Sequence, residues 1–130
     1  MMDVVDETLR EWRRSAFVYG QSDCMLSIGQ YLARTGHRDV TGQFLSQYST
    51  AEGAEAQMAA HGGIPGLLAL AGAVVKTGAP SRGDVLEIAY DDGSIGGLCT
   101  GDSAAVRLER GVVELKLRFL TILGVWAGSA

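Results

Sequence analysis

The sequence predicts an α+β domain in which N-terminal helices pack on a C-terminal antiparallel sheet. Two observations predict this class. Apolar residues recur at helical spacing over about residues 4–73, and short segments rich in Val, Ile and Leu alternate with Gly and Asp turns over about 74–127. With 130 residues, 47% of them hydrophobic, the chain has material for one core and no room for a second full domain. We therefore treat residues 1–130 as a single domain.

The first two helices are predicted by their apolar spacing. Residues 6–14 form an amphipathic helix with Asp6 as its cap and two arginines at its C-terminal end. The second helix begins at Cys24, and Ser22 or Asp23 provides its cap. Its apolar face is expected to lie in the core.

Two more helices follow. The alanine-rich segment 50–63 predicts a third helix that Ser49 or Thr50 caps. A fourth helix covers residues 64–73, with Pro65 in its first turn.

The second half is expected to be a meander of antiparallel strands. Turns containing Gly and Asp separate its apolar segments. The segments predicted to form strands are 74–78, 83–90, 95–109, 111–117 and 120–127.

Charge and hydropathy exclude several classes of function. The net charge is -4 and no basic run exceeds Arg13–Arg14, which argues against a nucleic-acid-binding surface. The acidic start "MMDVVDETLREW" lacks the basic and apolar regions of a signal peptide. No segment has the apolar length of a membrane span. We expect a protein made in the cytoplasm, with no membrane span and no nucleic-acid partner.

The cysteines and histidines show no metal-site spacing. Cys24 and Cys99 form no CxxC pair, so reduced thiols are expected. A set of Cys24, His37, Asp39 and His61 also lacks recognisable ligand spacing. No metal and no cofactor are expected.

Several motifs occur in a fixed order along nearly the whole chain. They are Trp12, "FVYGQSDC" (17–24), Gly62–Gly63, "RGDV" (82–85), "GGLCTG" (96–101) and Trp126. Together they resemble the NlpC-type branch of the papain-like cysteine peptidases, and more closely a group of small proteins of phage and prophage tail modules. The resemblance implies a papain-like, NlpC-type domain.

The resemblance assigns Cys24 to the nucleophile position at the start of a helix. A histidine from the following sheet is the family's base, but Ile95 stands at its position in "IGGLC". The third polar position falls around 106–108, where nothing is equivalent. The catalytic pair is therefore expected to be missing. Cys24 is then either an activated thiol or a small buried hydrophobic residue.

Two histidines lie elsewhere in the sequence. His37, at the end of the second helix, is about 20 Å from Cys24 at the helical rise and is expected to be solvated. A loop could bring His61 to Cys24, which makes it the candidate base of an active enzyme.

A remnant cleft is expected around Cys24. If Ile95 faces the cysteine helix, strand alternation places Cys99 on the same face, so the two thiols are neighbours. In the alternative, which we favour, this face is an apolar floor on which the second helix packs. The residues expected at the cleft are Tyr19, Gln21, Asp23, Ile95, Gly97 and Cys99.

The other polar motifs are expected to be structural. Asp84 follows a turn and can hold it by accepting backbone N–H groups. Arg107, Glu109 and Arg110 are expected to form a solvated surface, as charge-rich segments usually do.

The resemblance implies a non-catalytic adaptor at or near the tail tip of a phage or prophage. Such a protein is made in the bacterial cytoplasm and works in the virion tail through contacts with other tail proteins. One alternative is an active cysteine peptidase or amidase that cleaves peptidoglycan stem peptides, with Cys24 as nucleophile and His61 as base. Another is a module that binds cell-wall peptides in the remnant cleft.

Overall fold

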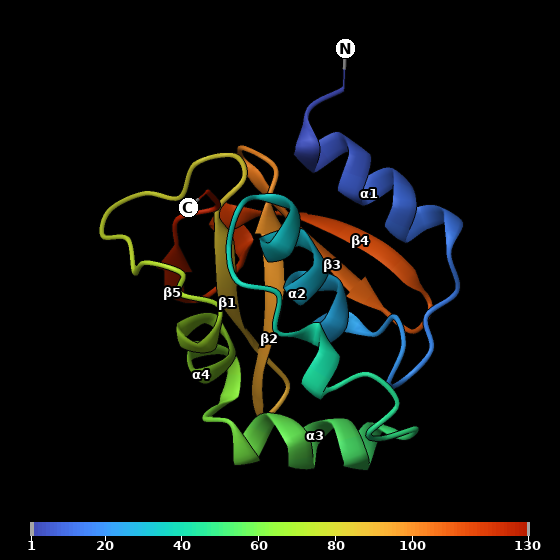
Figure 1. The fold of residues 1–130 in the computed structure, drawn as a ribbon. Coiled ribbons are helices and arrows are strands. Elements are labelled where there is room, and N and C mark those ends of the chain that lie inside the picture. Colours follow the sequence, from blue (N-terminus) through green and yellow to red (C-terminus); the bar gives the residue numbers. More distant parts are fainter. Residues whose placement is uncertain (1, 130) are drawn as a thin grey trace.

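The computed structural model describes residues 2–129 and confirms an α+β architecture (Figure 1). The helices are α1 (Val4–Arg14), α2 (Cys24–Arg34), α3 (Ala51–Ala60) and α4 (Gly63–Leu70), with 3-10 turns at Thr41–Gln43 and Leu117–Phe119. The strands are β1 (Val85–Tyr90), β2 (Gly93–Cys99), β3 (Ser103–Leu108), β4 (Gly111–Lys116) and β5 (Ile122–Trp126).

The five strands form one antiparallel sheet in the order β4-β3-β2-β1-β5. The first four strands make the expected meander, but β5 crosses to the far edge and pairs with β1. The segment expected as one strand at 95–109 is divided by a turn into β2 and β3. The prediction of a strand at 74–78 is wrong, because in this segment Val75 makes only an isolated bridge to Trp126.

One face of the sheet packs against the helices. Val85, Leu98 and Ala105 belong to the main core together with the apolar residues of α1, α2 and α4. In α1 these residues recur every three or four positions, which places them on one stripe. Figure 1 shows α1 and α2 lying in front of the strands.

The opposite face of the sheet forms a second apolar cluster. Its buried members are Leu86, Ile88, Ile95, Cys99, Ala104, Val106 and Val125. Leu117, Leu120 and Ile122 pack against it from the last connection and β5.

The two clusters correct the predicted orientation of β2. A Cβ on Gly96 would lie 3.3 Å from Ile28 of α2, whereas one on Gly97 would lie 2.7 Å from Ile88 on the other face. Ile95, Gly97 and Cys99 do share one face, as alternation predicts. That face, however, is not the floor on which the body of α2 packs.

The helix starts follow side-chain capping. Asp3, not Asp6, caps α1 by accepting a hydrogen bond from the Asp6 N–H at 2.9 Å. Asp6 instead lies in the first turn, where the helix dipole also favours a carboxylate. Of the two candidate caps expected for each helix, Asp23 caps α2 and Thr50 caps α3.

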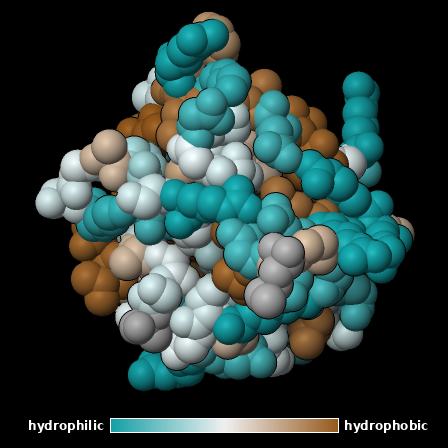
Figure 2. Space-filling view, turned by 90° about the horizontal axis from the view of Figure 1, so that it is seen from above, coloured by the Kyte–Doolittle hydropathy of each residue, from teal (hydrophilic) through white to brown (hydrophobic). Residues whose placement is uncertain are grey.

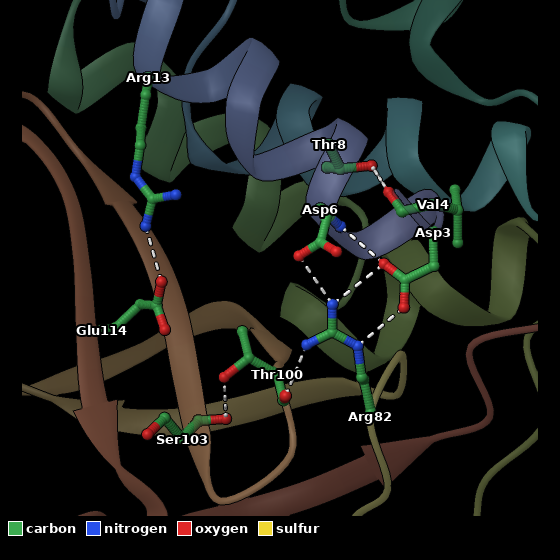
Figure 3. A network of polar contacts seen from close by, with 9 residues as sticks. All are labelled: Asp3, Val4, Asp6, Thr8, Arg13, Arg82, Thr100, Ser103 and Glu114. Carbon is green, nitrogen blue, oxygen red and sulfur yellow. Dashed lines mark hydrogen bonds and ion pairs between the residues drawn. The ribbon is translucent and has the colours of Figure 1, made fainter. Parts of the chain in front are cut away.

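Arg82 ties α1 to the sheet (Figure 3). Its guanidinium donates to the carboxylates of Asp3 and Asp6 and to the carbonyl of Thr100. A second pair at the other end of α1 joins Arg13 to Glu114 of β4 at 2.6 Å. Both ends of α1 are thus fixed relative to the strands.

The surface is polar over most of the face that Figure 2 shows, with hydrophobic residues gathered in separate places. The most exposed large apolar side chains include Phe119 at 72%, Val74 at 67% and Val75 at 66%. Within residues 2–129, no helix combines the length and the hydrophobicity needed to cross a membrane.

Candidate functional site

A cleft of about 720 Å³ opens where the start of α2 meets β2 and β3. These two strands pair only at Leu98–Ala105 and Cys99–Ala104, near the turn that joins them. Beyond these pairs both strands line the cleft, and α3 and the loop before α2 complete its walls. Its apolar and sulfur-bearing lining residues include Phe17, Tyr19, Cys24, Met25, Ala54, Met58, Ile64, Tyr90, Ile95 and Leu108.

Asp23 fixes the loop that carries the cysteine. Its buried carboxylate accepts the N–H groups of Gly20 at 2.8 Å and Leu26 at 3.0 Å. It also accepts the Tyr48 hydroxyl at 2.6 Å. Gly20 has a φ of 81°, and a Cβ there would lie 2.0 Å from the Tyr48 carbonyl oxygen, so only glycine fits this turn. Asp23 lines the cleft, but these internal donors occupy its carboxylate.

Cys24 is the first residue of α2 and is partly buried. Its side chain packs against the second apolar cluster, unlike the rest of α2. Burial raises the pKa of the Cys24 thiol to about 11, and the charge of Asp23 raises it further than burial alone would. Hydrogen bonds from the helix N-terminus act in the opposite direction and are outweighed. The thiol is therefore protonated at neutral pH.

His61 does not line the cleft. It lies at the C-terminal cap of α3, where its Nδ1 is 2.9 Å from the carbonyl oxygen of Gln57. Its ring packs edge-on against Phe44, with 4.7 Å between ring centroids. These contacts hold the imidazole in a structural position at a helix end.

His37 also lies outside the cleft, and the prediction that it is solvated is wrong. The chain folds back after α2, so that the His37 N–H donates to the Leu32 carbonyl at 3.0 Å. Its Nδ1 lies 3.1 Å from the Thr35 hydroxyl, and only 9% of the residue is exposed. With both histidines elsewhere, the cleft contains no imidazole.

Only some of the residues expected at the remnant cleft lie there in the structure. Tyr19, Asp23, Cys24 and Ile95 line it together. Gln21, Gly97 and Cys99 do not.

The residues outside the cleft have contacts of their own. The Gln21 side-chain amide donates to the Ser46 hydroxyl at 2.9 Å. Cys99 is fully buried, and its thiol donates to the Gly101 carbonyl at 3.4 Å. Both cysteines are free; Cys24 packs against the apolar cluster of which Cys99 is a buried member, but only Cys24 lines the cleft.

Arg107 also lines the cleft and was not expected there from the sequence. It was expected on a solvated surface, yet the residue is only 4% exposed. Its Nη2 donates to Ser15 Oγ and to the carbonyl oxygens of Ser15 and Ala16 at 2.9–3.0 Å. Its Nη1 lies 3.4 Å from Ser27 Oγ of α2.

Burial lowers the pKa of Arg107, although a guanidinium stays charged at any physiological pH. Strand alternation carried a signal for its position, because Arg107 follows Ala105 on the helix-facing side of β3. The neighbouring Glu109 and Arg110 are exposed, as expected.

Asp84 lies outside the cleft and holds a turn, as predicted. Its Oδ2 accepts the Ser81 N–H at 2.8 Å and the Lys76 ammonium at 2.6 Å, while Oδ1 accepts the Gly128 N–H at 3.3 Å. The side chain thereby joins the entry to β1 with the end of β5.

The part of the chain that the structure describes contains no group of three or more His, Cys, Asp or Glu side chains placed to hold a metal ion. The cleft lining combines a thiol that is protonated at neutral pH, the buried side chains of Asp23 and Arg107, the exposed charges of Glu55, Glu109 and Arg110, and apolar walls. No curated protein and no solved structure matches the chain. A family model does match it, over residues 2–127, so the chain belongs to the family described as Domain of unknown function (DUF6950).

Proposed function

We propose that this protein is a non-catalytic adaptor of a phage or prophage tail that retains the shape of a papain-like, NlpC-type peptidase domain. One observation carries the non-catalytic part. Cys24 and Ile95 share a cleft that contains no imidazole, and the pKa of the thiol is raised instead of lowered. Nucleophilic catalysis by cysteine requires a thiolate or a base within hydrogen-bonding reach.

The alternative of an active peptidase or amidase needs His61 as the base. The contacts of His61 with Gln57 and Phe44 oppose this role, since the ring would have to leave both to reach the cleft. We therefore favour the adaptor over the enzyme.

The tail assignment rests on the resemblance of the ordered motifs from Trp12 to Trp126. The proposal expects the contacts with other tail proteins to use exposed apolar side chains, since a contiguous apolar patch on a monomer marks a binding surface. Phe119, Leu123, Val74 and Val75 are each more than half exposed.

The test uses tagged protein in the phage or prophage that encodes the chain. We expect the protein to co-purify with tail particles, as detected by mass spectrometry. Because no step uses the thiol as a nucleophile, Cys24→Ser is expected to give particles with wild-type infectivity.

Asp23→Ala, which removes the carboxylate that organises the loop, serves as the comparison variant. Its loss of fold should lower incorporation into particles. Loss of infectivity in Cys24→Ser with normal incorporation would support the enzyme instead. Absence of the protein from all tail particles would contradict the adaptor.

A further inference from the structure

Arg107 differs from the other charged residues that line the cleft. Glu55, Glu109 and Arg110 are exposed to solvent, whereas Asp23 and Arg107 are buried. Asp23 is occupied by three donors of its own loop. Arg107 is therefore the one buried charge in the cleft whose hydrogen-bonding capacity is not used up.

The guanidinium has a free donor and no paired anion within the described residues. Its Nη atoms contact hydroxyl and carbonyl oxygens, and Arg107 forms no ion pair there. Its Nε–H makes no hydrogen bond in residues 2–129, and no side-chain nitrogen or oxygen sealed from solvent lacks a partner in that part of the chain. The Nε–H is therefore not fully sealed from solvent.

Burial lowers the pKa of Arg107 and the charges of Glu11 and Asp23 act to raise it, but neither carboxylate forms an ion pair with the guanidinium in the described residues. A carboxylate that enters the site could add charge-assisted hydrogen bonds to the guanidinium. Apolar side chains line the same cleft as Arg107. Ile95 and Leu108 belong to its side next to the second apolar cluster, and Phe17 and Tyr19 pack edge to face at 5.0 Å between their ring centroids. Binding sites for small groups commonly combine such apolar walls with a few placed polar groups.

We propose that this cleft binds the C-terminal carboxylate of a polypeptide that ends in an apolar residue. Arg107 receives the carboxylate, and the apolar walls receive the last side chain. A chain terminus suits the site because it places a carboxylate and an apolar side chain on one residue. The inference rests on the proposed non-catalytic role of the same cleft, since a bound terminus has no scissile bond beyond it.

The test is an NMR titration of the full chain with two capped dipeptides, N-acetyl-Ala-Leu with a free carboxylate and its C-terminal amide. We expect the acid to shift the amide signals of Cys24 and Gly96, which line the cleft, and to bind at least about tenfold more tightly than the amide. Equal binding of the two peptides would overturn the proposal. No binding of the acid at about 10 mM would do so as well.

Two further ligands test which kind of anionic group the cleft recognises. An amidated N-acetyl-Ala-Leu-Glu peptide offers only a side-chain carboxylate, and inorganic phosphate offers an anion without an apolar group. Both are expected to bind at least about tenfold more weakly than the acid dipeptide. Comparable binding of either ligand would contradict recognition of a chain terminus.

Arg107→Gln should lose at least about tenfold in affinity for the acid dipeptide, whereas Arg110→Gln, a change in an exposed cleft arginine, should stay within about twofold of wild type. Arg107 also holds the loop at Ser15 and Ala16, so Arg107→Gln is first checked for its fold. If it unfolds, the acid–amide comparison on the wild type decides alone. Failure of binding would leave thiol reactivity and particle incorporation unaffected, which distinguishes it from failure of the proposed function.

Discussion

Cys24 at the first position of α2 and Ile95 in β2 line the same cleft, although 71 positions separate them in the sequence. The thiol lies at a helix N-terminus, which ordinarily favours a thiolate. Here the neighbouring surfaces are apolar, and burial dominates the pKa. Cys24 therefore lies at a helix start in a cleft, but the cleft contains no imidazole that could activate the thiol.

Ile95→His should introduce an imidazole beside the thiol. An opposite charge within about 4–6 Å lowers the pKa of an acid by roughly 1–3 units, so the rate of Cys24 alkylation should rise at lower pH than in the wild type. Iodoacetamide kinetics between pH 6 and 10 measure this shift, with circular dichroism as the check of folding.

Val113→His is the control for that experiment. Val113 is exposed on β4 and does not line the cleft, so its replacement should leave the alkylation profile unchanged. An unchanged profile in a folded Ile95→His variant would show that position 95 does not face the thiol.

Asp23→Ala should destabilise the fold far more than loss of an ordinary helix cap. The substitution removes the cap of α2 and leaves the Gly20 N–H and the buried Tyr48 hydroxyl without their acceptor. We expect a loss of about 2–5 kcal/mol in the free energy of unfolding. Urea denaturation measures it. Thr50→Ala, which removes the exposed cap of α3, should cost about 1 kcal/mol. Equal losses of stability in the two variants would show that Asp23 acts only as an ordinary helix cap.

Because of Arg82, the free energy of unfolding should decrease as the pH falls through the acid range. Hydrogen bonds from Arg82 hold the pKa of Asp3 well below its usual value. A carboxyl whose pKa is lower in the folded state stabilises the fold above the unfolded pKa of about 3.9, and this contribution is lost as the pH falls below it.

The corresponding variant is Arg82→Gln, measured by urea denaturation at about pH 6 and about pH 2.5 on either side of the unfolded pKa. Its stability should fall less between the two pH values than that of the wild type. Arg118→Gln is the control, since Arg118 lies over the Phe119 ring and forms no ion pair with a carboxylate in the described residues. The same fall in Arg82→Gln as in the wild type would rule out this source of acid sensitivity.

Local sequence signals were sufficient for much of the fold. Asp23 and Thr50 precede apolar or alanine-rich segments, and both cap the expected helices because capping depends on a few neighbouring residues. The position of β5 beside β1 was not predictable in this way. That pairing depends on long-range contacts such as Val85 with Trp126, which no local pattern specifies.

The part of the candidate site that depends on neighbouring residues was also predictable from the sequence. The short loop before α2 fixes Tyr19, Asp23 and Cys24 locally, so their common position follows from neighbouring residues. For β2, strand alternation predicted that Ile95 and Cys99 lie on the same face of the strand. It did not predict which face of the sheet packs against the helices. Arg107 was missed because its burial depends on acceptors at Ser15 and Ala16, which are remote in the sequence.

The pH dependence of Cys24 alkylation in a Cys99→Ser background shows whether the cleft holds an activated thiolate, since only one thiol then reports. With the pKa of Cys24 raised to about 11, we expect a slow rate that keeps rising through pH 9–10 and shows no inflection at lower pH. An inflection well below the ordinary thiol value of about 8.5 would mean an activated thiolate and would contradict the non-catalytic account.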